Sequence, residues 1–146
     1  MSANIIFDSY ALLDLLEDGD GAQVVADCLS DPDTQVFLSM INLGEIYYIT
    51  LRRRGKRSAE EVIENILLEE SIALIETTWP RIKAAAFFKA EGGLSYADCF
   101  VLALADESKG PVVTGDPEII LQAGKEGIEV IDIRKNPPSG GDRNYY

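Results

Sequence analysis

Four acidic residues stand where their carboxylates could act together, and two of them directly follow short apolar runs. Asp8 follows the run 5–7, and Asp116 comes just after the run 112–114. Ligand sites of parallel sheets gather beyond the carboxyl ends of the strands, so both acids are candidates for such a site. Each also fits a plainer role as the N-cap of the next helix. Pro117 favours that alternative for Asp116, because proline suits the first helical position.

The other two acids, Glu45 and Asp98, lie in mostly apolar segments with helical spacing. Ile41, Glu45 and Ile49 are four residues apart and therefore share one helix face. Asp98 stands directly before the apolar run 99–105. An ionised carboxylate is costly to bury unless a cation or a hydrogen-bond donor meets it. The alternatives are a first-turn aspartate that favours the helix dipole, for Asp98, and a solvated position, for Glu45.

Carboxylates at two strand ends and on two inward-facing helices would supply the oxygen ligands that hard divalent cations prefer. Without a cation the clustered charges would repel one another. We therefore predict that Asp8, Glu45, Asp98 and Asp116 converge to hold Mg²⁺ or Mn²⁺, and leave open whether one or two ions bind. Such a site can polarise a phosphodiester and activate a water molecule.

The chain has no histidine, which excludes imidazole acid–base catalysis and a Ser-His-Asp arrangement. Cys28 and Cys99 are its two cysteines, and alone they cannot build a zinc site of the usual composition. We interpret them as small buried residues in a reducing compartment. No apolar run is long enough to cross a bilayer and no signal-peptide core is present, so we expect a cytoplasmic protein.

The formal net charge of −12 argues against a general nucleic-acid binder, because affinity for phosphate normally comes from lysine and arginine. Five of the thirteen basic residues are nevertheless concentrated in one short run. This run is either a solvated helix end or a contact to RNA phosphates beside the acidic site. It consists of Arg52, Arg53, Arg54, Lys56 and Arg57.

Strands that alternate with helices, and strands that are short apolar runs, predict an α/β fold with a parallel sheet covered on both faces. The expected strands cover residues 4–8, 35–39, 72–75, 111–114 and 128–133. The expected helices cover residues 9–17, 22–29, 41–53, 59–69, 79–90, 96–107 and 117–123. Ser58 with Glu61 has the spacing of a capping box, and Ser95 is the expected cap of the helix at 96.

Four segments resemble the signature blocks of PIN domains, and in particular those of VapC-type toxins from toxin–antitoxin pairs. They follow one another in the family's order and span nearly the whole chain. The segments are IFDS (6–9), LSMINLGEI (38–46), LSYADC (94–99) and VTGDPE (113–118).

The resemblance implies a three-layer α/β/α fold with a central parallel sheet of about five strands, and a Mg²⁺- or Mn²⁺-dependent endoribonuclease. It implies that Asp8, Glu45 and Asp98 are the central acids, that Asp116 is the fourth, and that Thr114 is a hydroxyl partner. The implied partners are an RNA substrate and a cognate antitoxin protein, and a homodimer is left open. We expect the PIN domain at residues 1–136 and a flexible tail at 137–146.

Two other functions remain open within this fold, namely a housekeeping RNA-processing nuclease and a non-catalytic PIN module that binds RNA or protein. Two other α/β classes fit poorly. A haloacid-dehalogenase-type phosphatase needs a second aspartate at position 10, where Tyr10 stands. A response-regulator receiver domain needs an acidic pair after the first strand, whereas Ser9 follows Asp8.

Overall fold

The computed structural model describes residues 3–134, which form five strands and seven helices in the order expected from the sequence. The strands are β1 (Ala3–Phe7), β2 (Thr34–Ser39), β3 (Ile72–Ile75), β4 (Val112–Thr114) and β5 (Val130–Asp132). The helices are α1 (Ser9–Leu16), α2 (Ala22–Ser30), α3 (Met40–Arg54), α4 (Lys56–Leu68), α5 (Trp79–Ala90), α6 (Tyr96–Ser108) and α7 (Pro117–Glu126).

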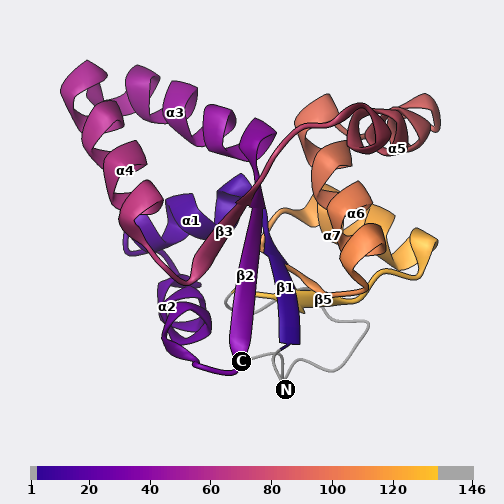
Figure 1. The fold of residues 1–146 in the computed structure, drawn as a ribbon, viewed down its shortest axis with the longest axis horizontal. Coiled ribbons are helices and arrows are strands. Elements are labelled where there is room, and N and C mark those ends of the chain that lie inside the picture. Colours follow the sequence, from indigo (N-terminus) through magenta and orange to yellow (C-terminus); the bar gives the residue numbers. More distant parts are fainter. Residues whose placement is uncertain (1–2, 135–146) are drawn as a thin grey trace.

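All five strands are parallel and follow the order β3-β2-β1-β4-β5 (Figure 1). Phe7 of β1 is paired with Leu38 of β2 on one side and with Val113 of β4 on the other. The chain runs outward from β1 to β3 and then returns to place β4 on the opposite side of β1. This change of direction creates a switch point between β1 and β4, and ligand sites gather at the carboxyl ends of the strands beside such a point.

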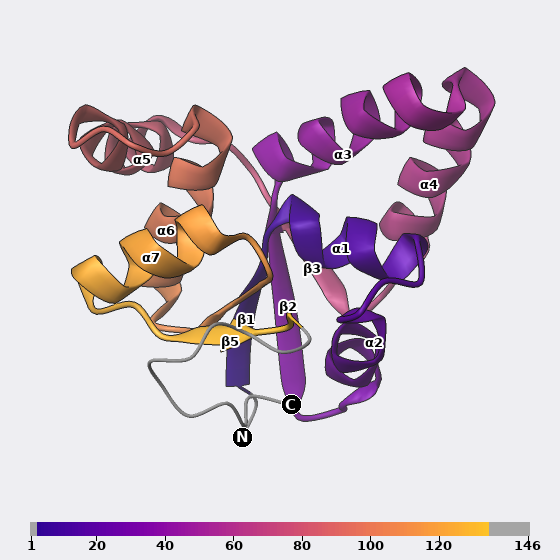
Figure 2. The ribbon, with the colours of Figure 1, turned by 180° about the vertical axis from the view of Figure 1, so that it is seen from behind.

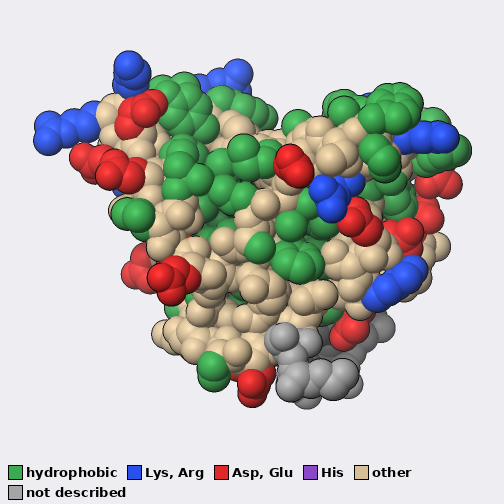
Figure 3. Space-filling model, viewed as in Figure 1, with side chains coloured by type: hydrophobic (Ala, Val, Ile, Leu, Met, Phe, Trp, Pro, Cys, Tyr) green, Lys and Arg blue, Asp and Glu red, His purple; other side chains and the backbone are tan. Residues whose placement is uncertain are grey.

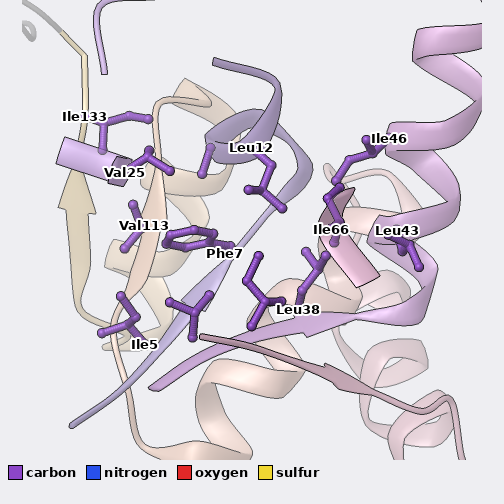
Figure 4. Packing of buried hydrophobic residues seen from close by; sticks show 13 residues of the cluster. Ile5, Phe7, Leu12, Val25, Leu38, Leu43, Ile46, Ile66, Val113 and Ile133 are labelled. Carbon is purple, nitrogen blue, oxygen red and sulfur yellow. The ribbon is translucent and has the colours of Figure 1, made fainter. Parts of the chain in front are cut away.

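Side chains alternate between the two faces of the sheet along each strand, so apolar side chains lie on both faces. Helices cover both faces and bury these side chains. Ile5, Phe7 and Leu38 pack in one core with residues from α1, α2, α3 and α4 (Figure 4). Ile6 and Val112 point the other way and pack with residues from α5, α6 and α7. The two groups of helices lie on opposite sides of the sheet in both ribbon views (Figures 1 and 2). The predicted three-layer α/β/α fold is confirmed.

Helix α6 carries an unbroken buried run in which every residue from Asp98 to Ala105 is enclosed. It contacts the strands β1, β2 and β4 as well as the helices α3, α5 and α7. A helix that is apolar on all sides is stable only in such surroundings. Asp98 is the one charged residue in this run, so the packing of α6 takes its carboxylate out of bulk water.

Helix α4 begins earlier than the sequence indicated, and the predicted capping box of Ser58 and Glu61 is wrong. The helix starts at Lys56 after Gly55, which makes no side-chain cap. Gly55 has a φ of +90°, a conformation that glycine adopts without steric cost. The tight turn at Gly55 therefore allows α4 to begin almost directly after α3, and Ser58 lies inside the helix.

The remaining differences are shifts of the ends of elements. Helix α7 extends to Glu126, three residues beyond the expected end, and stops at Gly127, whose φ is +72°. Both cysteines are free thiols; Cys99 is buried as predicted, whereas Cys28 is only partly buried. None of the helices in residues 3–134 is both long and apolar enough to span a membrane. The predicted tail at residues 137–146 lies outside the described residues.

Candidate functional site

Asp8 lies directly after β1, at the carboxyl end of the sheet and beside the switch point. Its side chain is 2% exposed and caps helix α1, because Oδ1 accepts a hydrogen bond of 2.9 Å from the backbone N–H of Ala11. Oδ2 accepts a second hydrogen bond from the hydroxyl of Thr114. Asp8 is therefore the N-cap of α1, and its two hydrogen bonds orient the carboxylate at the sheet edge.

Thr114 ends β4, the strand beside β1, and its hydroxyl connects two of the predicted site residues. It donates to Asp8 and accepts a hydrogen bond of 2.9 Å from the backbone N–H of Asp116. Asp116 in turn caps α7, since its Oδ1 accepts from the backbone N–H of Glu118 at 2.9 Å. The turn after β4 thus holds Asp116 next to the buried Asp8 carboxylate.

Glu45 is half-buried in the second turn of α3 and is held by two side chains that the sequence analysis did not assign. Its Oε1 accepts hydrogen bonds from the Ser9 hydroxyl at 2.6 Å and from Nδ2 of Asn42 at 3.4 Å. Asn42 Nδ2 also donates to the Ala97 carbonyl of α6 at 3.3 Å. Ser9 and Asn42 therefore fix Glu45 between the sheet edge and α6.

Asp98 lies in the first turn of α6 and is 9% exposed. Ser95 caps this helix as predicted, because its hydroxyl oxygen accepts from the backbone N–H of Asp98 at 3.2 Å. The position near the helix N-terminus favours a negative charge. The first-turn role and the site role are therefore compatible in Asp98, as they are in Asp8.

The pKa values of the Asp8 and Asp98 carboxyl groups are both raised, in part by the charges of the other carboxylates at this edge. Burial raises the pKa of Asp8 from 3.8 to about 8, against the lowering effect of its two hydrogen bonds, and the charges of Asp116 and Asp98 add to the rise. Burial also raises the pKa of Asp98 from 3.8 to about 6, and the charges of Asp116, Glu45 and Glu118 contribute. The packing of the sheet edge therefore brings all four predicted acids into one region of negative potential.

The donor chemistry of this region suits a hard divalent cation, because all of its charged groups are carboxylates. The buried Oδ1 of Asn42, next to Glu45, is a further oxygen that has no hydrogen-bond partner among residues 3–134. The ligand set is not preformed, however. No three His, Cys, Asp or Glu side chains of the described chain are grouped as a metal ion would require. The carboxylates of Asp8, Glu45 and Asp116 instead accept hydrogen bonds from neighbouring groups. Metal binding by these residues stays a prediction.

The five basic residues considered for RNA contact lie at the opposite end of α3 from its start at the sheet edge. Arg52, Arg53 and Arg54 form the last turn of α3, and Lys56 and Arg57 begin α4. All five are exposed. They form a basic tip on the α3–α4 hairpin and do not contact the acidic cluster.

Two members of this tip are engaged in ion pairs. Arg53 contacts Glu17 at 2.6 Å, and Arg57 contacts Glu61 at 3.5 Å. Among residues 3–134, no carboxylate lies within ion-pair distance of Arg52, Arg54 or Lys56. Three of the five cations are therefore available for an anionic ligand.

Sequence reasoning missed three residues of this site. Asn42 could have been found, because it lies three residues before Glu45 and hence on the same helix face. Ser9 stands in the IFDS segment, but its contact with Glu45, 36 positions away, could not be read from the sequence, because only the packing of α1 against α3 brings the two together. Glu118 adds a further negative charge near Asp98. Its position two residues after Asp116 did not distinguish it in the sequence from an ordinary first-turn glutamate.

An open parallel sheet with a cluster of acids at its switch point defines an α/β protein with an acidic ligand site. Comparison with the models of known protein families identifies the family to which the chain belongs. The model for the PIN domain matches residues 5–125. The chain belongs to the PIN domain family.

Solved structures with the same fold include several toxins and toxin–antitoxin complexes. The Mycobacterium tuberculosis VapC20 toxin, described as cleaving the sarcin–ricin loop, is 21% identical, with a TM-score of 0.67 over 81% of this chain and 94% of its own. DNA-bound VapBC from Salmonella typhimurium is 13% identical, with a TM-score of 0.69 and coverage of 90% and 99%.

A toxin–antitoxin complex from Klebsiella pneumoniae is 18% identical, with a TM-score of 0.63 and coverage of 92% and 99%. At these identities the similarity establishes the fold. No curated protein matches the sequence significantly.

Proposed function

We propose that this PIN domain is a divalent-metal-dependent endoribonuclease. The observation that carries the proposal is the buried carboxylate of Asp8, whose pKa is raised to about 8 beside the charges of Asp98 and Asp116. Uncompensated negative charge at a switch point disfavours the fold unless a cation neutralises it. An apolar or amide side chain would be less costly there, so the buried carboxyl group points to a cation with a chemical task.

Asp8 and Asp98 are the central ligands in this proposal, with Mg²⁺ or Mn²⁺ as the cation. Glu45 and Asp116 act as further ligands or as bases that orient the attacking water. The bound cation would polarise the scissile phosphate and lower the pKa of the attacking water. Thr114 positions Asp8 through its hydrogen bond, and Ser9 positions Glu45 in the same way.

The basic tip at the end of α3 is the proposed contact for RNA phosphates on one side of the site. The free cations there are Arg52, Arg54 and Lys56, and they would attract a polyanion toward a chain that is otherwise strongly acidic. The described residues thus pair an acidic centre with a separate cationic surface. This division suits a nuclease that binds its cation and its strand with different groups.

Cleavage of RNA in the presence and absence of metal tests the catalytic proposal. The purified chain should cut RNA with Mg²⁺ or Mn²⁺, and a chelator should stop it. Asp98→Asn should lower the rate by roughly a hundredfold or more, because it removes charge from the metal site. Glu64→Gln removes a charge from an exposed position on α4 and should leave the rate unchanged. Equal rates for Asp98→Asn and the parent would refute the assignment.

We further propose that the chain is the toxin of a toxin–antitoxin pair and that a cognate antitoxin inhibits it. Structures related in fold were crystallised as such complexes, and they match over nearly their full length. An inhibitor should present arginine or lysine to the acidic site, where it would compete with the metal for the carboxylates.

Growth of a bacterial host separates the toxin from a housekeeping nuclease. Expression of the chain alone should slow growth, and the Asp8→Asn variant at matched expression should not. Co-expression with the product of the neighbouring gene should restore growth if that product is the antitoxin. Unimpaired growth with the active parent would favour a housekeeping enzyme.

A further inference from the structure

Tyr48 is the one residue of the α3 surface that combines an aromatic ring with large exposure beside a free cation. From the sequence alone, Tyr47 and Tyr48 fit either the core or a dimer face, and their apolar surroundings favour the core. Tyr47 is half-buried, and its hydroxyl donates a hydrogen bond to Glu60 of α4. Tyr48 differs, since 45% of its surface is exposed. An aromatic side chain held at the surface loses the benefit of burial, and that loss suggests another role.

The position of Tyr48 connects the acidic site with the basic tip. It lies three residues after Glu45 and four before Arg52, so the three side chains follow one stripe of the helix. Seven residues separate Glu45 from Arg52, which corresponds to about 10 Å along the axis. Gly44 lies beside this stripe, and a Cβ built there would meet no atom within 4 Å. The helix surface next to Glu45 is therefore open at Gly44.

The surface views agree with an accessible path. Helix α3 begins at the carboxyl end of β2 and runs outward across the top of the molecule, away from α5 and α6 (Figure 1). The space-filling view shows the upper surface dipping between these two sides (Figure 3).

Arg52 contacts the exposed ring of Tyr48. The guanidinium carbon of Arg52 lies 5.3 Å from the centroid of the Tyr48 ring, which is within the range of a cation–π contact. This contact orients both groups, and no carboxylate of residues 3–134 competes for Arg52. The result is a guanidinium group held over one face of the Tyr48 ring, within about two helical turns of Glu45.

We propose that Tyr48 and Arg52 form a nucleotide subsite, in which an unpaired base stacks on Tyr48 and Arg52 contacts an adjoining phosphate. This inference rests on the proposed ribonuclease function and adds a residue to it. Single strands are held by stacking on aromatic rings together with cationic side chains along the backbone. A paired base cannot reach the ring, so the subsite selects unpaired RNA next to the cleaved bond.

Direct binding tests the subsite without cleavage. The probe is a short fluorescein-labelled single-stranded RNA of random sequence, mixed with the chain in chelator and followed by anisotropy. Tyr48→Ala should raise Kd by roughly 5- to 150-fold, the factor that corresponds to about 1–3 kcal/mol for one stacked base. Tyr48→Phe keeps the ring and should bind like the parent. Leu68→Ala removes an exposed apolar side chain at the far end of α4 and serves as the matched control.

Salt dependence separates the role of Arg52 from that of Tyr48. Arg52→Gln should reduce the slope of log K against log salt by about 0.7, because one phosphate contact to a single strand is lost. Tyr48→Ala should leave the slope unchanged while it weakens binding at every salt concentration. Lys125→Gln, an exposed cation on α7, should change neither quantity. A slope that responds equally to Arg52→Gln and Lys125→Gln would overturn the assigned phosphate contact.

The outcomes distinguish failure of the subsite from failure of the proposed function. If the parent cleaves RNA and Tyr48→Ala matches it in Kd and in KM, the subsite is refuted and the nuclease remains. If the parent neither binds nor cleaves RNA, both are refuted. Support requires that Tyr48→Ala raise KM with kcat retained, as expected for a binding contact shared by ground and transition states. If Tyr48→Ala instead changes the mass of the particle in sedimentation, Tyr48 serves an interface between copies and the subsite is refuted.

Discussion

Replacement of Asp8 by asparagine should stabilise the metal-free protein at neutral pH, although it removes a central residue of the proposed site. Asp8 is 2% exposed and its carboxylate is costly to ionise in the fold. The amide of asparagine keeps an acceptor for the N–H of Ala11 and offers a donor to the Thr114 hydroxyl. Asparagine is also as good an N-cap as aspartate. The substitution therefore removes the charge while the local contacts are retained.

The size of the effect follows from the raised pKa of Asp8. The folded state holds a proton on Asp8 that the unfolded chain releases, so the free energy of unfolding falls as pH rises through this window. The window runs from the ordinary value of 3.8 to the folded value of about 8. One pKa unit corresponds to about 1.4 kcal/mol, so a shift from 3.8 to about 8 makes the full cost of ionised Asp8 on the order of 6 kcal/mol above the window. Below it, parent and variant should be equally stable in this respect.

Urea unfolding of parent and Asp8→Asn in chelator, repeated across this pH range, measures the difference. The stability advantage of the variant should grow with pH, by up to about 1.4 kcal/mol per unit. Glu70→Gln removes an exposed carboxylate and should follow the parent curve. Saturating Mn²⁺ should flatten the pH dependence of the parent, because metal ligands bind deprotonated. A difference between parent and Asp8→Asn that is constant with pH would refute the buried, protonated carboxylate.

Four further outcomes are expected in thermal or urea unfolding. Mn²⁺ at a hundredfold excess over Kd should stabilise the parent by about 2.7 kcal/mol, and Asp98→Asn should lose most of this gain; an unchanged gain would argue against Asp98 as a ligand. Ser95→Ala should cost roughly 0.5–2 kcal/mol through loss of the α6 cap, with the Mn²⁺ response retained. Gly124→Ala should stabilise α7 by about 0.5–1 kcal/mol, because a Cβ there meets nothing within 4 Å. Gly110→Ala should instead destabilise by about 1–3 kcal/mol, because its Cβ would collide with the backbone carbonyl of Asn4; equal effects at the two glycines would contradict this packing.

The order of the strands and helices, and the position of the acids relative to them, could be read from the sequence. Apolar runs with period two or 3.6 are local signals, and Asp8, Ser95 and Asp116 stand at the boundaries that such runs define. The start of α4 was misjudged because a capping pattern at Ser58 competed with the turn at Gly55. Local patterns therefore identify elements better than they place the ends of elements.

The chemistry of the site depended on contacts that no local pattern contains. Thr114 and Asp8 are 106 residues apart, and they form a hydrogen bond because β4 is inserted beside β1. The raised pKa of Asp8 comes first from burial, and burial is a property of the packed layers.

The two neighbouring tyrosines of α3 show the same division. Tyr47 packs toward α4 and donates to Glu60, whereas Tyr48 is exposed beside Arg52. The sequence determined which residue types are present and which helix face they share. The tertiary structure decided which of them are buried, charged or free to bind, because burial and long-range contacts arise only when the elements pack together.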